Sequence, residues 1–392
     1  MICDFNQHPI SMKNKQIHYS LLVIILAITF SCKKSIDPVV DKTTSTTTPT
    51  TPTTITTKYP LVLSPNNLLV SIQVPATTFS FANESYYGIF SSVDSVKVFS
   101  DIIYKRFKDN FDFIFIITNN ATHLSNQPYG VNFGVSNSVQ GTGAPIYQNG
   151  WGSTSAKLKS FMFLPYKDAI TYGPTLHEIC HNWANFIPKG IFKTIDGNKA
   201  NLPEIDAVDG HWGVASTNGQ LGGFELATLK TLTGAPNHYH AQSGTNSSFG
   251  LFANGGNSLA YSPIELYMMG LAAKSEVPDI TVFSGLTVEA NDFFNKGNFF
   301  ATSKKTLSLD QIITQSGIGE RVPNYQSSQK EFRAIVAVVS PTALTSAEWT
   351  SYEKSITDFF KKSNDETPLF NFYEATKGRG WIKTDQLNLE SK

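Results

Sequence analysis

The sequence predicts an α+β fold in which a mixed β-sheet packs against amphipathic helices. Two apolar runs, residues 111–118 and 158–164, have the length and the aromatic and β-branched content of buried strands. Other segments repeat apolar residues at helical spacing, and Gly, Asn and Ser residues mark frequent turns. No linker-like stretch divides residues 59–392, which favours one folded unit with a C-terminal α/β subdomain.

The first half of this range alternates helix and strand. A 3-4-4 spacing of apolar residues predicts an amphipathic helix that leads into strand 111–118. Its apolar residues are Val96, Phe99, Ile103 and Phe107. A loop at 165–173 separates strand 158–164 from a second predicted helix.

That second helix has start and stop signals of its own. Pro174 suits the first turn of a helix, and Pro188 followed by Gly190 is expected to end it. The next segment, residues 188–260, is rich in Gly and Asn and predicts loops and short hairpins around a cleft.

The C-terminal part combines one strong strand with one well-capped helix. Residues 332–339 are almost entirely apolar and predict a buried strand. Thr345 and Glu348 have the spacing of a capping box, which predicts that a helix begins there. The apolar face of that helix consists of Trp349, Tyr352, Ile356 and Phe359.

The composition is compatible with a large core and argues against nucleic-acid binding. Of 392 residues, 41% are hydrophobic and only 16% are charged, so a sizeable core can form. Lys and Arg number 31, as do Asp and Glu, and no long basic run occurs. We therefore expect no nucleic-acid partner.

The N-terminal segment has the features of an export signal. Lys13 and Lys15 precede an apolar run at 21–30, which is too short to span a membrane and ends in small residues before Cys32. With a cysteine at the cleavage point, it resembles a bacterial lipoprotein signal. The resemblance implies that Cys32 is lipidated and holds the protein on a membrane. It also implies an extracytoplasmic location in the cell envelope, on the outer membrane or the cell surface.

These features divide the chain into three parts. Residues 1–32 form the signal peptide, in which Met12 is a better start than Met1. Residues 33–58 are rich in Thr and Pro and predict a disordered tether, whereas 59–392 form the folded part. After removal of the signal, Cys180 is the only thiol besides Cys32, so we expect no disulfide framework.

The strongest functional signal is a His-Glu-x-x-His pattern formed by His177, Glu178 and His181. Residues four apart on a helix lie on one face, so the two imidazoles can reach one metal ion. Glu178 is about 100° around the helix from His177, where it can face a metal-bound water without being a ligand. This spacing predicts two zinc ligands and a general base.

The surrounding sequence supports a metal site over two simpler explanations. Apolar residues of the same helix, from Leu176 to Ile187, fall on the side opposite the histidines, so these are not core histidines of the apolar face. Glu178 could instead pair with Thr175 in a capping box, but this leaves both histidines unexplained. Cys180 falls on the apolar side and is expected to be a small buried hydrophobe.

The motif and its flanks resemble the zincin metallopeptidases. The order of helix, strand, edge-like strand and motif helix is similar to the N-terminal half of that family. The resemblance implies a zincin-like catalytic domain in which a strand runs along the cleft above the active helix. The extended metzincin pattern is absent, because Ile187 stands where a third histidine would be.

A catalytic zinc ion requires a third protein ligand and an open position. His211 is the preferred candidate, since its flanking glycines let the backbone approach a metal and Asp206 or Asp209 could orient the imidazole. Four further residues remain candidates for this position: Glu225, Glu265, His238 and His240. For Glu265, a capping role after Ser262 and Pro263 also accounts for the residue.

We therefore expect a zinc metalloendopeptidase that hydrolyses polypeptides of the extracellular space or cell surface. Zn²⁺ held by His177, His181 and His211 lowers the pKa of its water, and Glu178 takes the proton. A different function compatible with the sequence is that of a non-catalytic surface lipoprotein that binds protein or glycan. A third is hydrolysis of a non-peptide bond.

Overall fold

The computed structural model describes residues 58–85, 88, 92–184, 186–187, 190–195, 204–206, 210–364 and 369–384. All of them belong to one compact unit, Thr50–Lys392. The predicted signal peptide, Cys32 and nearly all of the predicted tether lie outside these residues. Within them, no helix is both long enough and apolar enough to cross a membrane.

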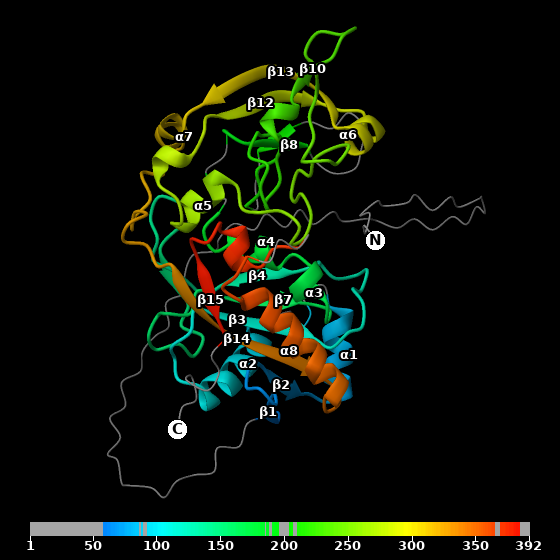
Figure 1. Cartoon of the computed structure of the whole chain (residues 1–392), viewed down its shortest axis with the longest axis vertical. Helices are drawn as coiled ribbons and strands as arrows, with labels where there is room; N and C mark the ends of the chain where they lie inside the picture. The colour runs from blue at the N-terminus through cyan, green and yellow to red at the C-terminus, as the bar shows by residue number, and fades with distance from the viewer. Residues whose placement is uncertain are drawn as a thin grey trace, which may run out of the picture. The chain divides into compact units, whose positions relative to one another are not determined.

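The largest sheet is mixed, as predicted for an α+β protein. Its strands in spatial order are β1 (Leu61–Leu63), β2 (Val70–Gln73), β14 (Glu331–Ser340), β3 (Phe113–Thr118), β7 (Ser160–Leu164) and β4 (Val131–Gly134), with β15 (Trp381–Lys383) also paired to β14. Figure 1 shows these strands in the same spatial order, from β1 at the bottom of the sheet to β4 at its top. The four central strands are parallel, whereas β1 and β4 are antiparallel to their neighbours.

Both faces of the sheet are covered because its strands alternate their side chains between two cores. In β3, Ile114 and Ile116 point into one core, with helix α2 (Val93–Arg106) and Ala82 of α1 (Ala76–Glu84). Phe113, Phe115 and Ile117 point into the other. That second core includes α4 (Thr175–Cys180), α5 (Pro263–Met269) and α8 (Ser346–Phe360).

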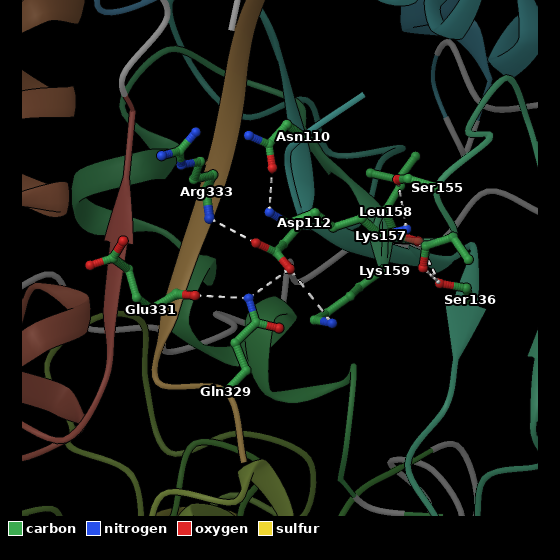
Figure 2. A network of polar contacts seen from close by, with 11 residues as sticks. Asn110, Asp112, Ser136, Ser155, Lys157, Leu158, Lys159, Gln329, Glu331 and Arg333 are labelled. Atoms are coloured by element: carbon green, nitrogen blue, oxygen red, sulfur yellow. Dashed lines mark hydrogen bonds and ion pairs between the residues drawn. The ribbon is translucent and has the colours of Figure 1, made fainter. Parts of the chain in front are cut away.

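A buried carboxylate ties three strands of this sheet together at their N-terminal ends (Figure 2). Asp112, only 1% exposed, accepts hydrogen bonds from the Arg333 backbone N–H and the Gln329 side chain, both at 2.9 Å. The ammonium of Lys159 lies 3.6 Å from the same carboxylate. Asp112, Arg333 and Lys159 belong to the starts of β3, β14 and β7, so the contact helps to set their register.

A second sheet is built from the middle of the chain. It is antiparallel, in the order β10 (Lys230–Thr231), β11 (His238–His240), β13 (Asn298–Leu307) and β12 (Ile280–Thr287). Phe283 of β12 and Phe299 of β13 pack with Phe224, Phe249 and Phe293 in a separate aromatic core. β10 and β11 form a short hairpin within residues 188–260, as the sequence predicts, whereas the longer strands β12 and β13 follow that range.

The remaining elements are short. They are β5 (Ser136–Asn137), β6 (Tyr147–Gln148), α3 (Ala169–Tyr172), β8 (Lys193–Ile195), β9 (Glu204–Asp206), η2 (Leu226–Thr228), η3 (Lys274–Glu276), α6 (Ala290–Lys296), α7 (Leu309–Ser316) and α9 (Phe372–Ala375).

Two expectations about the sheet need correction. The strand at 158–164 is not at the edge: β7 is fully buried between β3 and β4, and β4 forms the edge. The C-terminal strand and helix form no separate subdomain, because β14 lies between β2 and β3 and α8 packs on the same sheet. In both cases the strand order depends on pairings between residues far apart in the chain.

Candidate metal centre

The helix that carries the motif is shorter than predicted. α4 ends at Cys180, with His181 as its C-cap, although the His181 N–H still bonds to the His177 carbonyl at 3.3 Å. Asn182 explains the early end, since both its backbone N–H (3.2 Å) and its side-chain amide (2.9 Å) donate to the Ile179 carbonyl. His177 and His181 nevertheless remain one turn apart on one face.

Three imidazoles converge at this helix. The Nε2 atom of His177 lies 3.0 Å from that of His181 and 3.3 Å from that of His211. Two zinc–nitrogen bonds of about 2.0–2.1 Å in tetrahedral geometry separate their nitrogens by about 3.3 Å. In the described part of the chain, this is the one group of at least three His, Cys, Asp or Glu residues found close enough to share a metal ion.

The hydrogen bonding of His177 fixes its tautomer. Its Nδ1 lies 2.8 Å from the backbone carbonyl of Gln220, which can only accept a hydrogen bond. Nδ1 therefore carries the proton, and the Nε2 lone pair faces the other two rings. This is the usual arrangement of a histidine that ligates a metal through Nε2.

His211 is placed by a loop that two backbone hydrogen bonds hold directly after it. The backbone N–H of Trp212 bonds to Leu221, and that of Gly213 bonds to Leu251. Gly213 is required for a reason that differs from the predicted one. Its φ is +62°, and an added Cβ would lie 2.3 Å from the Lys193 carbonyl. The glycine therefore permits a tight turn against β8.

Of the two predicted partners for His211, Asp206 has another role. Its carboxylate pairs with Lys193 across the β8–β9 hairpin and accepts from the Gly190 N–H at 3.1 Å. Asp209 lies outside the described residues.

Burial keeps all three histidines neutral, which is the state that binds metal. It lowers the pKa of His177 to about 4, against a hydrogen bond to Gln220 that acts in the opposite direction. Burial, and then the neighbouring imidazoles, lower the pKa of His181 and His211 well below the usual value. His177 is 7% exposed, whereas the other two ligand candidates, His181 and His211, are partly exposed to solvent.

Glu178 lies against the edge strand of the main sheet. Its backbone carbonyl accepts from the Asn132 side chain of β4 at 2.5 Å. A Cβ added to Gly130 would lie 3.0 Å from the Glu178 Oε1 atom, so the carboxyl group sits beside the start of β4. Burial raises the pKa of Glu178 to about 8, and a hydrogen bond to the backbone of Asn132 acts in the opposite direction. A cation bound nearby would favour the ionised carboxylate.

Two histidines that the sequence also offered as third ligands lie in the second sheet. His240 contacts Asn298 at 3.0 Å and Gln242 at 3.2 Å through its two ring nitrogens, and His238 stacks on Phe300. Both belong to β11 and are not part of the histidine cluster.

The two candidate glutamates also lie outside the cluster. Glu225 precedes the short helix η2. Glu265 is fully buried and accepts from the Ser262 N–H at 2.9 Å, which is the capping role that the sequence suggests. Cys180 is a buried free thiol.

Several residues of the site could not be recognised from the sequence. Gln220 acts through its backbone carbonyl, and Gly130 acts by leaving space, so neither has a chemical signature. Phe252, whose exposed ring lies 5.3 Å from that of His211, belongs to a loop with no periodic pattern.

Comparison with known proteins adds no assignment. No family model, no curated protein and no solved structure matches the chain.

Proposed function

We propose that this protein is a zinc-dependent endopeptidase with a zincin-like active site. The observation that carries the proposal is the convergence of three neutral imidazole Nε2 atoms next to a buried glutamate. A catalytic zinc site uses three protein ligands and keeps its fourth position for water or substrate. A purely structural zinc site normally has four protein ligands.

The residues present fit Zn²⁺ by their chemistry as well as by their spacing. Neutral imidazoles are good zinc ligands, and His177 donates its other ring nitrogen to a carbonyl, as ligating histidines usually do. A bound Zn²⁺ would supply Lewis acidity, which polarises a carbonyl group and lowers the pKa of water.

The chain's own residues would then move the proton. Glu178 is next in sequence to His177 and is buried, with its carboxyl group beside β4. In its ionised form it takes a proton from the water that attacks the substrate carbonyl. It then gives this proton to the leaving amine.

The position of β4 favours a polypeptide as the substrate. β4 is the end strand of the main sheet, is partly exposed along its length, and contacts α4 at the motif. An end strand offers backbone N–H and C=O groups to which an extended peptide can pair. A peptide in that position would pass the Glu178 carboxyl group.

We also propose that the protein is an envelope lipoprotein. The proposal rests on the sequence around Cys32 and on the Thr- and Pro-rich segment that follows. The membrane partner would be reached through lipidated Cys32, with the folded part outside the cytoplasm.

The test compares two single substitutions. Glu178→Gln should keep stoichiometric zinc and lose at least about a hundredfold in peptidase activity, the lower range for a general base. His177→Ala should lose both zinc and activity. Metal content is measured by elemental analysis and activity with a fluorogenic casein substrate.

A buried glutamate outside the histidine cluster provides the matched control. Glu374 is buried and caps α9, so Glu374→Gln should leave zinc and activity unchanged. Wild-type activity in Glu178→Gln would refute the assignment of the base. Absence of zinc from the wild-type protein would favour the alternative function, a non-catalytic surface lipoprotein that binds protein or glycan.

A further inference from the structure

We propose that Glu265 is the positioning residue of the metal centre, acting on His177 through one peptide group and on His211 through its neighbour Trp212. The inference rests on the proposed zinc site, since it concerns how the ligands are held. In this role Glu265 does more than cap α5, and it is not itself a metal ligand.

Glu265 is unusual because a fully buried carboxylate accepts four hydrogen bonds. Oε1 accepts from the Leu221 N–H at 2.8 Å and the Trp212 indole at 3.0 Å. Oε2 accepts from the Ser262 N–H at 2.9 Å and the Gln220 N–H at 3.1 Å. Only the bond from Ser262 belongs to the cap of α5. The other three hold the segment between residues 212 and 221.

One peptide group links the carboxylate to a ligand. In the peptide group between Gln220 and Leu221, the N–H donates a hydrogen bond to Glu265 Oε1, and the C=O accepts one from His177 Nδ1. In a trans peptide these two groups point in opposite directions, so the peptide bridges the two side chains. A negative charge on the N–H side polarises the carbonyl, which strengthens its hold on the His177 proton. The Nε2 atom then becomes a better metal donor.

The second arm reaches the loop of His211. Trp212 follows His211 directly and is completely buried. Its indole N–H is fixed on the same Oε1 atom that accepts from Leu221. The Oε1 atom of Glu265 therefore fixes both Trp212, which follows the candidate ligand His211, and the peptide group that holds the candidate ligand His177.

Gly219 shows how closely this segment approaches the carboxylate. A Cβ added at Gly219 would lie 2.3 to 2.4 Å from both oxygens and the carboxyl carbon of Glu265. Alanine at this position would push the segment away from Glu265.

The experiment separates positioning from simple helix capping. Glutamine serves at this position of a capping box as well as glutamate, so a cap alone predicts that Glu265→Gln is tolerated. A positioning role predicts weaker zinc binding, because the amide NH₂ group of glutamine would replace one carboxylate oxygen and face two of the four N–H donors. Glu374→Gln changes a buried capping glutamate of α9 and is the matched control.

The readouts are zinc affinity and the metal environment. Zinc dissociation constants are measured for the purified proteins by competition with a chromogenic chelator. We expect Glu265→Gln to weaken zinc binding about tenfold to a hundredfold, the range for partners of metal ligands. The visible absorption of the Co²⁺-loaded protein should change as well. Glu374→Gln should retain the wild-type affinity and spectrum.

Each outcome supports or overturns the inference. Wild-type affinity and spectrum in folded Glu265→Gln, with His177→Ala unable to bind zinc, would overturn the role of Glu265 and leave the zinc site standing. Failure of the wild-type protein to bind zinc would overturn both. If Glu265→Gln does not fold, Gly219→Ala must show the same loss of affinity.

Discussion

His177 uses its two ring nitrogens for different purposes. Its Nδ1 is held by the Gln220 carbonyl, and its Nε2 faces His181 and His211. Burial favours the neutral ring, which suits metal binding but makes the metal-free protein sensitive to acid.

This sensitivity can be predicted with its sign. The pKa of His177 is about 4 in the folded state, against 6.5 when unfolded. Between these values the unfolded chain binds more protons, so the contribution to stability is complete above pH 6.5 and is lost as the pH falls toward 4. The loss amounts to about 3 kcal/mol at about 1.4 kcal/mol per pKa unit.

The measurement is urea unfolding of chelator-treated protein from pH 7 to pH 4.5. His177→Gln removes this titrating group, so its free energy of unfolding should fall less steeply over that range. Equal slopes for the two proteins would contradict the prediction.

Gly130 gives a second prediction at the level of one residue. An added methyl group would lie 2.9 Å from Glu178 Cγ and 2.7 Å from Pro174 Cγ. Gly130→Ala should therefore displace the proposed base and lower kcat by at least about tenfold, since misplacement by about 1 Å can cost a hundredfold. Zinc content should stay stoichiometric. Unchanged kcat would show that Glu178 has room to adjust.

At this scale the sequence predicts local chemistry well and distant partners poorly. The spacing of His177 and His181 is a property of one helical turn, so it can be read directly. The Gln220 carbonyl reaches His177 across 43 residues of chain. A backbone group has no residue type that could reveal such a contact.

Among the elements, β14 has the central position in the main sheet. It pairs with β2, β3 and β15, and its start is fixed by the Arg333 N–H on Asp112. Asp112 thus links strands that come from three distant parts of the sequence (Figure 2).

Removing this carboxylate should be costly. Asp112→Ala leaves the largely buried ammonium of Lys159 without its counter-charge and the Arg333 N–H without an acceptor. We expect a loss of about 3 kcal/mol in the free energy of unfolding, as for other broken buried pairs. Urea denaturation measures it.

An exposed ion pair at the same end of the sheet is the control. Glu331 pairs with Lys383 where Glu331 is about half exposed, so Glu331→Ala should change stability by less than about 1 kcal/mol. If the two variants lose equal free energy of unfolding, the buried network around Asp112 stabilises the protein no more than an exposed ion pair does.

Helix starts were predictable because capping is local, whereas strand order was not. Thr345 accepts from the Glu348 N–H at 3.3 Å, as the sequence pattern predicts. β4 escaped prediction because Val131 and Phe133 are its only large apolar residues. It is a strand because it pairs with β7, and that pairing depends on the whole sheet.

For the molecule as a whole, metal binding should appear as thermal stability. The candidate ligands join α4 to the loop of residue 211, so a bound ion cross-links distant segments. At a free zinc concentration about 1,000 times the dissociation constant, the gain is about 4 kcal/mol. A chelator should therefore lower the melting temperature of wild-type protein.

The control lacks one ligand. His211→Ala should melt at nearly the same temperature with and without chelator. If the chelator leaves the wild-type melting temperature unchanged, the cluster does not hold a stabilising ion under those conditions.

The place of β14 in the sheet also determines when the fold can form during synthesis. β2 and β3 are made early, yet the strand that lies between them begins only at Glu331. A growing chain shorter than about 330 residues has two incomplete half-sheets with open edges, which are prone to pair wrongly. Assembly of the central sheet must wait until most of the chain has left the ribosome.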